Sequence, residues 1–368
     1  MNMNRTQSHK AAQTRPNGYS NLSGRSGPSD EDEMPSIKPV TVIDVVDQTI
    51  AGDPLLSNVE LPLQKLYHPL GFSMEVITNS EEVLAAAEES WGGLGKIFGE
   101  PALELRIAVG EGGSGVCPPS PVYRGQRHLL SIVADAQNFA VCDRRQGFAF
   151  AWVDGDAVER KAYLRYHFLE AIALSLLASS YVTPLHAACV ELAGHGVLLC
   201  GNSGAGKSSL AFACARAGWR YVSDDASYLV RKGGGRLVVG NSHQLRFRPS
   251  AIELFPELEG LSITPRAAGK PSIELPTVLM PDVETAKQST VDYIIFLNRV
   301  ESDSPELLPF PKELAMQWAK QSQADTGETD EQEASIRQLL NAQLFELRYR
   351  TLDRAVASLE ALITEERW

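Results

Sequence analysis

The chain has 368 residues, enough for one large domain or two ordinary ones with a sizeable hydrophobic core. A hydrophobic content of 43% and a charged content of 22% are typical of a soluble globular protein. The formal net charge of -12 makes the surface repel phosphate polyanions, which argues against nucleic acid as a partner held by bulk charge.

The cysteines and the apolar runs indicate the compartment. None of the five cysteines forms a CxxC pair, and no histidine cluster has zinc-finger spacing. Cys200 and Cys214 lie inside apolar runs, which is typical of small core residues. An odd cysteine count without a pairing pattern fits a reducing compartment. Since no stretch resembles a signal peptide or a membrane span, we expect a cytoplasmic protein with no membrane partner.

The first part of the chain divides into a tail and a module. Residues 1–38 are polar and nearly lack large apolar side chains, so we predict a disordered tail. Residues 39–157 predict a small N-terminal α+β module, which contains a helix at 81–91. The Gly-rich stretch at 110–115 is expected to be a loop, because it lacks the Lys-Ser/Thr of a phosphate cradle. The strand-sized apolar runs of this module are Leu103–Val109, Leu129–Val133 and Phe148–Val153.

A second domain is expected over residues 158–300, beginning with the strongest helical pattern of the chain at 158–180. On this helix, His167 and Glu170 are candidates for catalysis, but a structural or surface role is the favoured interpretation. The glycines at 233–235 separate two apolar runs and predict a hairpin.

The last segment, residues 301–368, is expected to close the second domain as helix, strand and helix. The predicted elements are a linker at 321–330, a helix at 332–343, a strand at 345–349 and a helix at 353–363.

A glycine-rich loop follows directly on the short apolar run at 197–200, which suits a buried strand. The loop matches the pattern G-x-x-x-x-G-K-S, and a helical segment from Ser209 to Ala217 comes next, closed by Gly218. Strand, loop and helix therefore stand in the order that a P-loop requires. The eight residues of the loop are Gly201, Asn202, Ser203, Gly204, Ala205, Gly206, Lys207 and Ser208.

The chemistry of phosphate binding explains these residue types. Glycines let the backbone curl so that successive N–H groups point at phosphate oxygens, and the helix N-terminus adds a fixed positive end. Lys207 would supply an ammonium group to the β- and γ-phosphates, and the Ser208 hydroxyl would ligate Mg²⁺. We therefore predict that residues 201–209, including Ser209 at the helix start, bind ATP with Mg²⁺.

A P-loop also needs acidic side chains, to hold the metal or to activate a nucleophile. The apolar run at 293–297 ends in Asn298-Arg299 without a carboxylate, and neither a GTPase base-reading motif nor a transporter ATPase signature is present. Asp224 and Asp225 follow the first apolar run after the P-loop helix. A strand running back alongside the P-loop strand would bring both acids near the loop, whereas a surface turn is the alternative.

The stretch 186–225 resembles the catalytic domain of HPr kinase/phosphorylase, a bacterial P-loop serine kinase. The resemblance rests on His186 before a strand and a turn, on the P-loop, and on the Asp224-Asp225 pair at matching offsets. It implies a mixed α/β (α+β) fold class with an HPr kinase/phosphoenolpyruvate carboxykinase-like P-loop core. By position, it implies that Asp224 is the general base, that Asp225 supports the metal or the base, and that His186 lines the phosphate site.

The chain departs from that family at two places. Asn202 stands where the family usually has Asp, and the glutamate-containing segment of the family is absent. Arg246, Arg248 and Lys270 stand near its expected place, either as clamps for phosphate or substrate or as ordinary surface cations.

Three functions remain open on the sequence. The first is an ATP-dependent kinase that phosphorylates a serine-like hydroxyl of a protein, a peptide or a small molecule. The second is a nucleotide-gated binding or regulatory protein without phosphotransfer, and the third is an ATPase coupled to motion. The sequence leaves open whether the chain forms a homo-oligomer.

Overall fold

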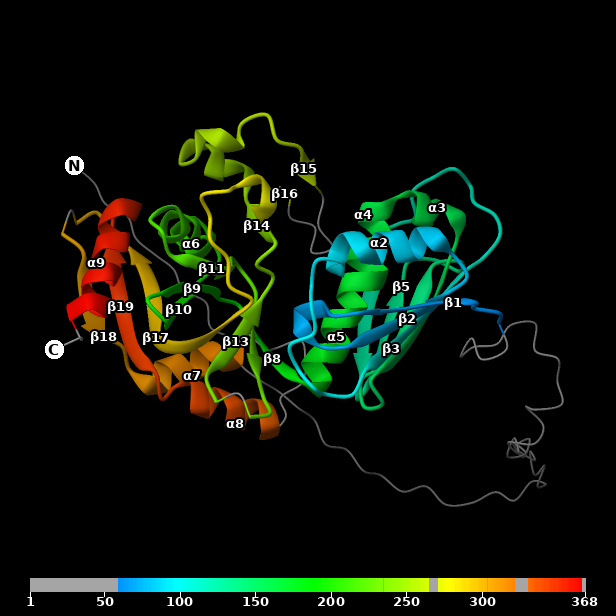
Figure 1. Ribbon diagram of the computed structural model, residues 1–368, viewed down its shortest axis with the longest axis horizontal. Helices are drawn as coiled ribbons and strands as arrows, with labels where there is room; N and C mark the ends of the chain where they lie inside the picture. The colour runs from blue at the N-terminus through cyan, green and yellow to red at the C-terminus, as the bar shows by residue number, and fades with distance from the viewer. Residues whose placement is uncertain (1–58, 234, 265–270, 303, 322–329, 366–368) are drawn as a thin grey trace, which may run out of the picture. The chain divides into compact units, whose positions relative to one another are not determined.

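The computed structural model describes residues 59–233, 235–264, 271–302, 304–321 and 330–365 (Figure 1). The predicted disordered tail lies outside the described residues. So do Lys270 and the predicted linker, except for its first and last residues.

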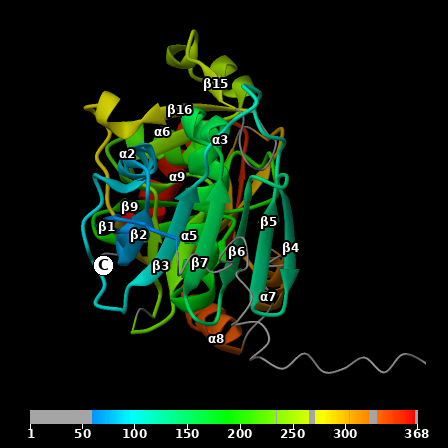
Figure 2. The same ribbon diagram turned by 90° about the vertical axis from the view of Figure 1, so that its right-hand side faces the viewer.

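The first sheet has seven strands in the order β1-β2-β3-β7-β6-β5-β4, which Figure 2 shows face-on. The strands pair antiparallel except for β2, β3 and β7, which are parallel to one another. All three strands predicted in this region are present with the expected bounds. The strands are β1 Leu63–Tyr67, β2 Met74–Thr78, β3 Leu103–Val109, β4 Val122–Gln126, β5 Leu129–Val133, β6 Phe139–Asp143 and β7 Phe148–Val153.

The predicted helix at 81–91 is confirmed as α2 (Glu81–Trp91). The Ser80 side chain accepts a hydrogen bond from the Val83 amide at 3.3 Å, and two glutamates stand in the first turn. Both features stabilise a helix N-terminus, because they satisfy an unpaired amide and complement the helix dipole.

The helical pattern at 158–180 forms four consecutive segments, among them a π-helical turn. Several of its apolar side chains, among them Phe168 and Ile172, are fully buried in the core of the first sheet. The domain boundary expected at residue 157 stays a prediction, although this core extends beyond it. The segments are α3 Gly155–Glu159, α4 Lys161–Leu164, the π-helix η2 Arg165–Glu170 and α5 Ala171–Ser180.

The second sheet has nine strands, seven of which follow the order β11-β9-β10-β17-β13-β12-β8, while β19 pairs with both β17 and β18. The P-loop strand β10 lies between β9, which is antiparallel to it, and β17, which is parallel. The strands are β8 Val182–Leu185, β9 Ala188–Leu192, β10 His195–Cys200, β11 Arg220–Ser223, β12 Ser227–Val230, β13 Leu237–Gly240, β17 Gln288–Arg299, β18 Glu306–Pro309 and β19 Gln343–Tyr349.

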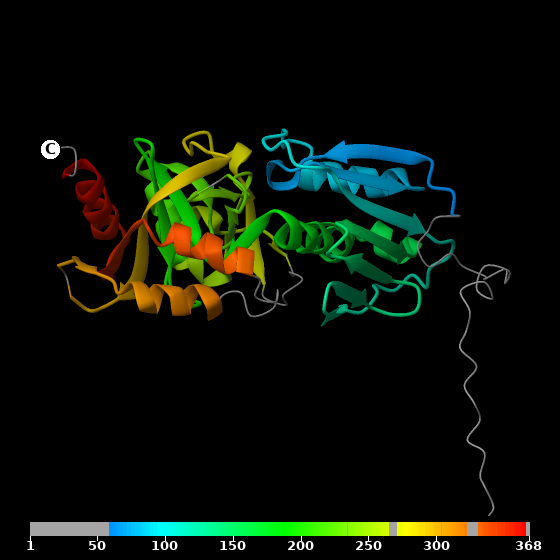
Figure 3. The same cartoon turned by 90° about the horizontal axis from the view of Figure 1, so that it is seen from below.

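Helices cover both faces of this sheet at β10. Val197 and Leu199 pack in one core with α6 (Lys207–Arg216) and α9 (Leu352–Glu365). The alternate residues, Leu198 and Cys200, pack in another core with α7 (Lys312–Gln321) and α8 (Asp330–Leu339), the orange helices of Figure 3. Because side chains alternate along a strand, a strand buried on both faces must be apolar throughout. The mixed α/β class is therefore confirmed.

A third, three-stranded sheet carries residues that reach the P-loop. Its order is β14-β16-β15, with antiparallel pairing throughout. Its strands are β14 Gln244–Phe247, β15 Ile263–Thr264 and β16 Ser272–Pro276. The short 3-10 helices are η1 Pro69–Gly71, η3 Pro249–Glu253, η4 Pro256–Leu258 and η5 Thr277–Leu279.

Two further expectations concern pairing. The hairpin predicted at the glycines 233–235 is confirmed, because β12 and β13 pair antiparallel on either side of them. The strand before the twin aspartates, β11, does not lie alongside the P-loop strand, because it pairs with β9 instead. Within the described part of the chain, no helix has the length and apolarity needed to cross a membrane.

Candidate active site

The P-loop connects β10 to helix α6, as the sequence predicts. Gly204 and Gly206 adopt left-handed backbone conformations, with φ of 92° and 96°, which side chains with a Cβ rarely tolerate. At Gly206 an added Cβ would also lie 2.7 Å from the Tyr349 hydroxyl. That hydroxyl donates a hydrogen bond to the carbonyl of Ala205 at 3.1 Å, so β19 contacts the loop and helps to hold its conformation.

Lys207 is the centre of a short line of polar contacts. Its ammonium group donates to the Gly201 carbonyl at 3.0 Å and lies 3.2 Å from Nε2 of His186. The other ring nitrogen of His186 lies 3.3 Å from Oδ1 of Asp225. Three of the predicted site residues therefore form a line, lysine to histidine to aspartate, beside the P-loop.

The twin aspartates reach the P-loop by a different route from the one expected. Both β10 and β11 are antiparallel to β9 and therefore parallel to each other, so the turns that follow them lie at the same edge of the sheet. Asp224 is only 8% exposed, and its Oδ2 accepts a hydrogen bond from the Arg246 amide at 2.6 Å. Its carbonyl accepts from the Ser208 hydroxyl at 3.2 Å, which connects the aspartates to the P-loop helix.

A cavity of about 370 Å³ opens over the P-loop. Gly201, Asn202 and Ala205 do not line it, although they belong to the same loop. Three arginines, Arg246, Arg248 and Arg299, do line it. The predicted site residues that line it are His186, Ser203, Gly204, Gly206, Lys207, Ser208, Ser209 and Asp225.

Arg248 and Arg299 come from different sheets. Arg248 follows β14 and donates to the Ser203 hydroxyl at 2.6 Å. Arg299 ends β17, the strand parallel to the P-loop strand, and the sequence reasoning assigned it no role. Its signal is present in the sequence, because it stands where a P-loop protein often carries an acidic residue after an apolar strand. A cation at this position can bind a phosphate oxygen.

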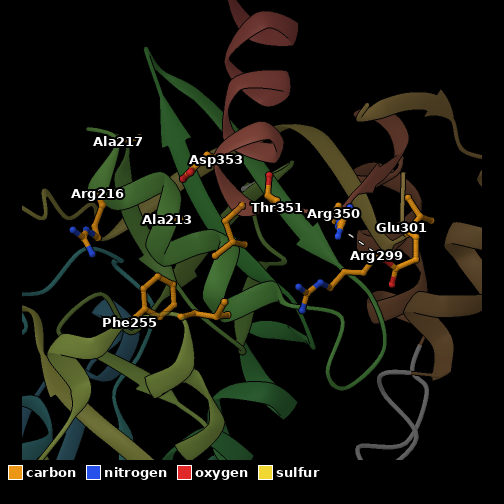
Figure 4. Close-up of a pocket in the computed structure, with 12 residues that line it drawn as sticks. Ala213, Arg216, Ala217, Phe255, Arg299, Glu301, Arg350, Thr351 and Asp353 are labelled. Atoms are coloured by element: carbon orange, nitrogen blue, oxygen red, sulfur yellow. Dashed lines mark ion pairs between the residues drawn. The ribbon is translucent and has the colours of Figure 1, made fainter. Parts of the chain in front are cut away.

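A larger cavity of about 880 Å³ adjoins the first and shares Leu254 and Arg299 with it (Figure 4). In this view the Arg299 side chain extends toward the middle of the cavity. Phe255 contributes an apolar part of the wall, and Arg350 lies 3.9 Å from the Glu301 carboxylate.

A third, smaller cavity of about 90 Å³ lies on the other side of the aspartates. It is lined by Asp224 and shares Asp225 and Arg246 with the P-loop cavity. The two aspartates are adjacent in the sequence but differ in the cavities that they line. Asp225 lines both cavities, whereas Asp224 lines only the small one.

Arg246 is held by two carboxylates from distant segments. Its guanidinium lies 3.6 Å from Glu170 of the π-helix and 3.4 Å from Glu274 of β16. Although burial opposes the charge, these glutamates keep the pKa of Arg246 above its usual value. The Tyr166 hydroxyl also donates a hydrogen bond to Glu274 at 2.6 Å. The pKa of Tyr166 is raised, chiefly by burial and to a lesser extent by the Glu274 carboxylate.

The donors fit a magnesium ion that is shared with a nucleotide. No cluster of three or more His, Cys, Asp or Glu side chains suited to a metal occurs among the described residues. Mg²⁺ in phosphoryl-transfer sites takes only one or two protein ligands and completes its shell with phosphate oxygens and water. The Ser208 hydroxyl and the Asp225 carboxylate line the same cavity, which is compatible with that ligand set.

Comparison with known proteins gives matches around this site. Residues 177–254 match the family described as HPr Serine kinase C-terminal domain. Over 78 residues the chain is 37% identical to an HPr kinase/phosphorylase of Chlorobium phaeobacteroides, which covers 21% of each protein. Over 81 residues it is 38% identical to an HPr kinase/phosphorylase of Bacillus cereus, covering 22% of this chain and 24% of the relative.

Among solved structures, the Hpr(Ser) kinase/phosphatase from Coxiella burnetii aligns with 50% of this chain and 93% of its own, at 14% identity and a TM-score of 0.27. The sequence match to the first relative spans about a fifth of that protein's length. The matched segment contains the P-loop, His186 and both aspartates. Over this segment, the chain is similar to the C-terminal domain of the HPr kinase/phosphorylase family.

Proposed function

We propose that this protein is an ATP-dependent kinase that transfers the γ-phosphoryl group to a hydroxyl of an acceptor. The observation that carries the proposal is the line from Lys207 through His186 to Asp225, with contacts of 3.2 and 3.3 Å, inside one cavity over the P-loop. This line supports the proposal, because a carboxylate beside the P-loop lysine can act on the terminal phosphate of a bound nucleotide or on its metal.

Each charged group then has a task that its position supports. The P-loop amides and Lys207 would hold the β- and γ-phosphates, while Arg248 and Arg299 would neutralise charge that develops on the phosphoryl oxygens. Mg²⁺, when bound with the nucleotide, supplies charge neutralisation, and Ser208 and Asp225 are the residues that would hold it. His186 would keep Lys207 and Asp225 apart at fixed positions.

Asp224 is the residue that would accept the proton. The acceptor oxygen forms a bond to the γ-phosphorus, the bond from that phosphorus to the β,γ-bridging oxygen breaks, and ADP leaves. The hydroxyl proton passes to the Asp224 carboxylate, which the Arg246 amide orients through Oδ2. The nucleoside half of ATP would extend past Arg299 into the larger adjoining cavity, since the two cavities share that residue.

The test is transfer of label. The protein is incubated with Mg²⁺ and γ-labelled ATP together with extract fractionated into macromolecules and small molecules, and labelled products are then identified. We expect an acid-stable phosphate monoester that does not form with Lys207→Ala. Nucleotide binding without label in any fraction would instead support the nucleotide-gated binding protein. Release of labelled inorganic phosphate alone, also lost in Lys207→Ala, would support the ATPase.

A further inference from the structure

The small cavity beside Asp224 has two unlike walls. One wall is polar and comes from the P-loop side of the molecule, with Asp224, Asp225 and Arg246. The other is apolar and comes from the segments that pack on the first sheet, with Trp91 at the end of α2 and Leu174 on α5. A cavity with an apolar body and a few convergent polar groups is the usual form of a small-molecule site.

We propose that this cavity is the acceptor site and that it selects a small neutral or cationic alcohol, with the hydroxyl toward Asp224 and the remainder against the apolar wall. This inference rests on the proposed kinase function and names the substrate class of the same site.

The position of the cavity supports this assignment. Asp225 and Arg246 line both the small cavity and the P-loop cavity, so an acceptor hydroxyl at their shared wall stands next to the terminal phosphate of a nucleotide. Phosphoryl transfer depends chiefly on positioning and charge neutralisation, and it needs the two reacting oxygens roughly in line with the phosphorus. Two cavities that share Asp225 and Arg246 would bring the acceptor hydroxyl and the terminal phosphate together at that wall.

The volume of the cavity restricts the size of the acceptor. A cavity of about 150 Å³ holds benzene, so space of about 90 Å³ holds on the order of four non-hydrogen atoms. An acceptor of this size that carries the hydroxyl required by a kinase is a short alcohol.

The charges restrict the chemistry. Glu170, Asp224 and Asp225 contribute carboxylates to the lining, and Arg246 contributes a guanidinium that is already paired with Glu170 and Glu274. An additional anion would meet an excess of carboxylates at short range, which disfavours its binding. A neutral hydroxyl compound or one with an ammonium group meets no such repulsion.

The same geometry assigns a task to the first sheet and its helices. Leu70, Trp91, Leu94 and Leu174 all belong to segments that pack in the core of that sheet. Since these residues form the apolar wall, they would decide which acceptor fits, while the P-loop side carries out the transfer.

The experiment combines three short alcohols with variants that fill the cavity. Ethanolamine, 1-propanol and glycolate represent the cationic, neutral and anionic forms, and each is offered with γ-labelled ATP and Mg²⁺. Leu174→Phe adds volume to the apolar wall. Leu130→Phe is the matched control, because Leu130 is also a partly buried leucine against the same core but does not line the cavity.

We expect saturable phosphorylation of ethanolamine or 1-propanol and at least tenfold less of glycolate. Leu174→Phe should lower kcat/KM for the alcohol at least tenfold with ATP affinity unchanged, and Leu130→Phe should behave as the wild type. If Leu174→Phe does not fold, Leu94→Phe at the same wall replaces it.

Other outcomes separate this inference from the proposed function. Label that enters a protein from the extract equally in wild type and Leu174→Phe, with none in the alcohols, overturns the small-alcohol assignment and leaves the kinase standing. Preference for glycolate overturns the charge argument. Absence of label in every acceptor contradicts the kinase itself and removes the inference with it.

Discussion

Asp224 and Asp225 are neighbours in sequence with different surroundings. Asp224 is 8% exposed and accepts from a main-chain amide, whereas the Asp225 side chain is 36% exposed and faces His186. Both aspartates line the small cavity, but adjacent side chains leave the backbone in different directions, and only Asp225 also lines the P-loop cavity. This separation gives each aspartate its own expected phenotype.

Substitution of the two aspartates should therefore separate turnover from nucleotide binding. Asp224→Asn keeps the shape but loses the base, so kcat should fall by about 10²- to 10⁴-fold with little change in the KM for ATP. Asp225→Asn should chiefly raise the concentrations of Mg²⁺ and ATP that give half-maximal activity. Steady-state kinetics at varied ATP and Mg²⁺ measure both effects. Equal losses of kcat in the two variants, at unchanged ATP and Mg²⁺ dependence, would contradict the division of roles.

At the scale of the elements, the P-loop requires glycine at position 206 for two separate reasons, the backbone conformation and the space beside it. Gly206 has φ of 96°, and an added Cβ would approach the Tyr349 hydroxyl of β19. Gly206→Ala should lose nucleotide affinity, because a left-handed alanine costs about 1–2 kcal/mol and the loop must also shift. Adding Tyr349→Phe removes the clash, together with the hydrogen bond to the Ala205 carbonyl, but not the backbone strain. Calorimetric titration with ATP should therefore show an affinity between those of Gly206→Ala and of Tyr349→Phe alone. Full recovery would show that the backbone conformation is unimportant here.

The π-helix η2 carries a buried histidine that should make stability depend on pH. Burial lowers the pKa of His167 below 6.5, and its Nδ1 lies 2.8 Å from the Tyr123 hydroxyl of β4. The folded state therefore resists protonation, while the unfolded chain takes up a proton as the pH falls below about 6.5, so acid favours unfolding at this residue.

This linkage is measured by comparing unfolding free energies between about pH 7.5 and pH 5. His167→Gln cannot take up that proton, so its stability should fall less steeply with acid than that of the wild type. The difference in slope is limited to about 1.4 kcal/mol per pH unit for one proton. Parallel stability curves for the two proteins would show that His167 does not contribute.

At the scale of the whole molecule, the cysteines report on folding. Cys142, Cys189, Cys200 and Cys214 are buried, and Cys117 is exposed. Burial raises the pKa of Cys142 and of Cys189 to about 12, which removes the reactive thiolate at neutral pH. A thiol reagent should therefore modify one cysteine quickly in the folded protein and all five in denaturant. Rapid modification of a second thiol without denaturant would contradict the packing described.

The parts of the molecule that depend on local sequence were predictable. The helix at 81–91 and the strand at 103–109 have the expected bounds. Both elements are determined by the spacing of apolar residues and by turn residues that lie close to them in the sequence. The P-loop was likewise evident, since its chemistry requires fixed offsets between neighbours. Long-range pairing was not predictable. That β11 pairs with β9, and that Glu170 and Glu274 meet at Arg246, depends on segments far apart in the sequence.

The wall that Asp225 and Arg246 form between the P-loop cavity and the small cavity has a thermodynamic consequence. A ligand that alters the position of either residue on one side changes the free energy of binding on the other, and linkage makes this effect mutual and equal in size. Nucleotide and acceptor should therefore assemble into one ternary complex before any bond changes. The phosphoryl group would then pass directly to the acceptor, with no phosphorylated form of the protein as an intermediate.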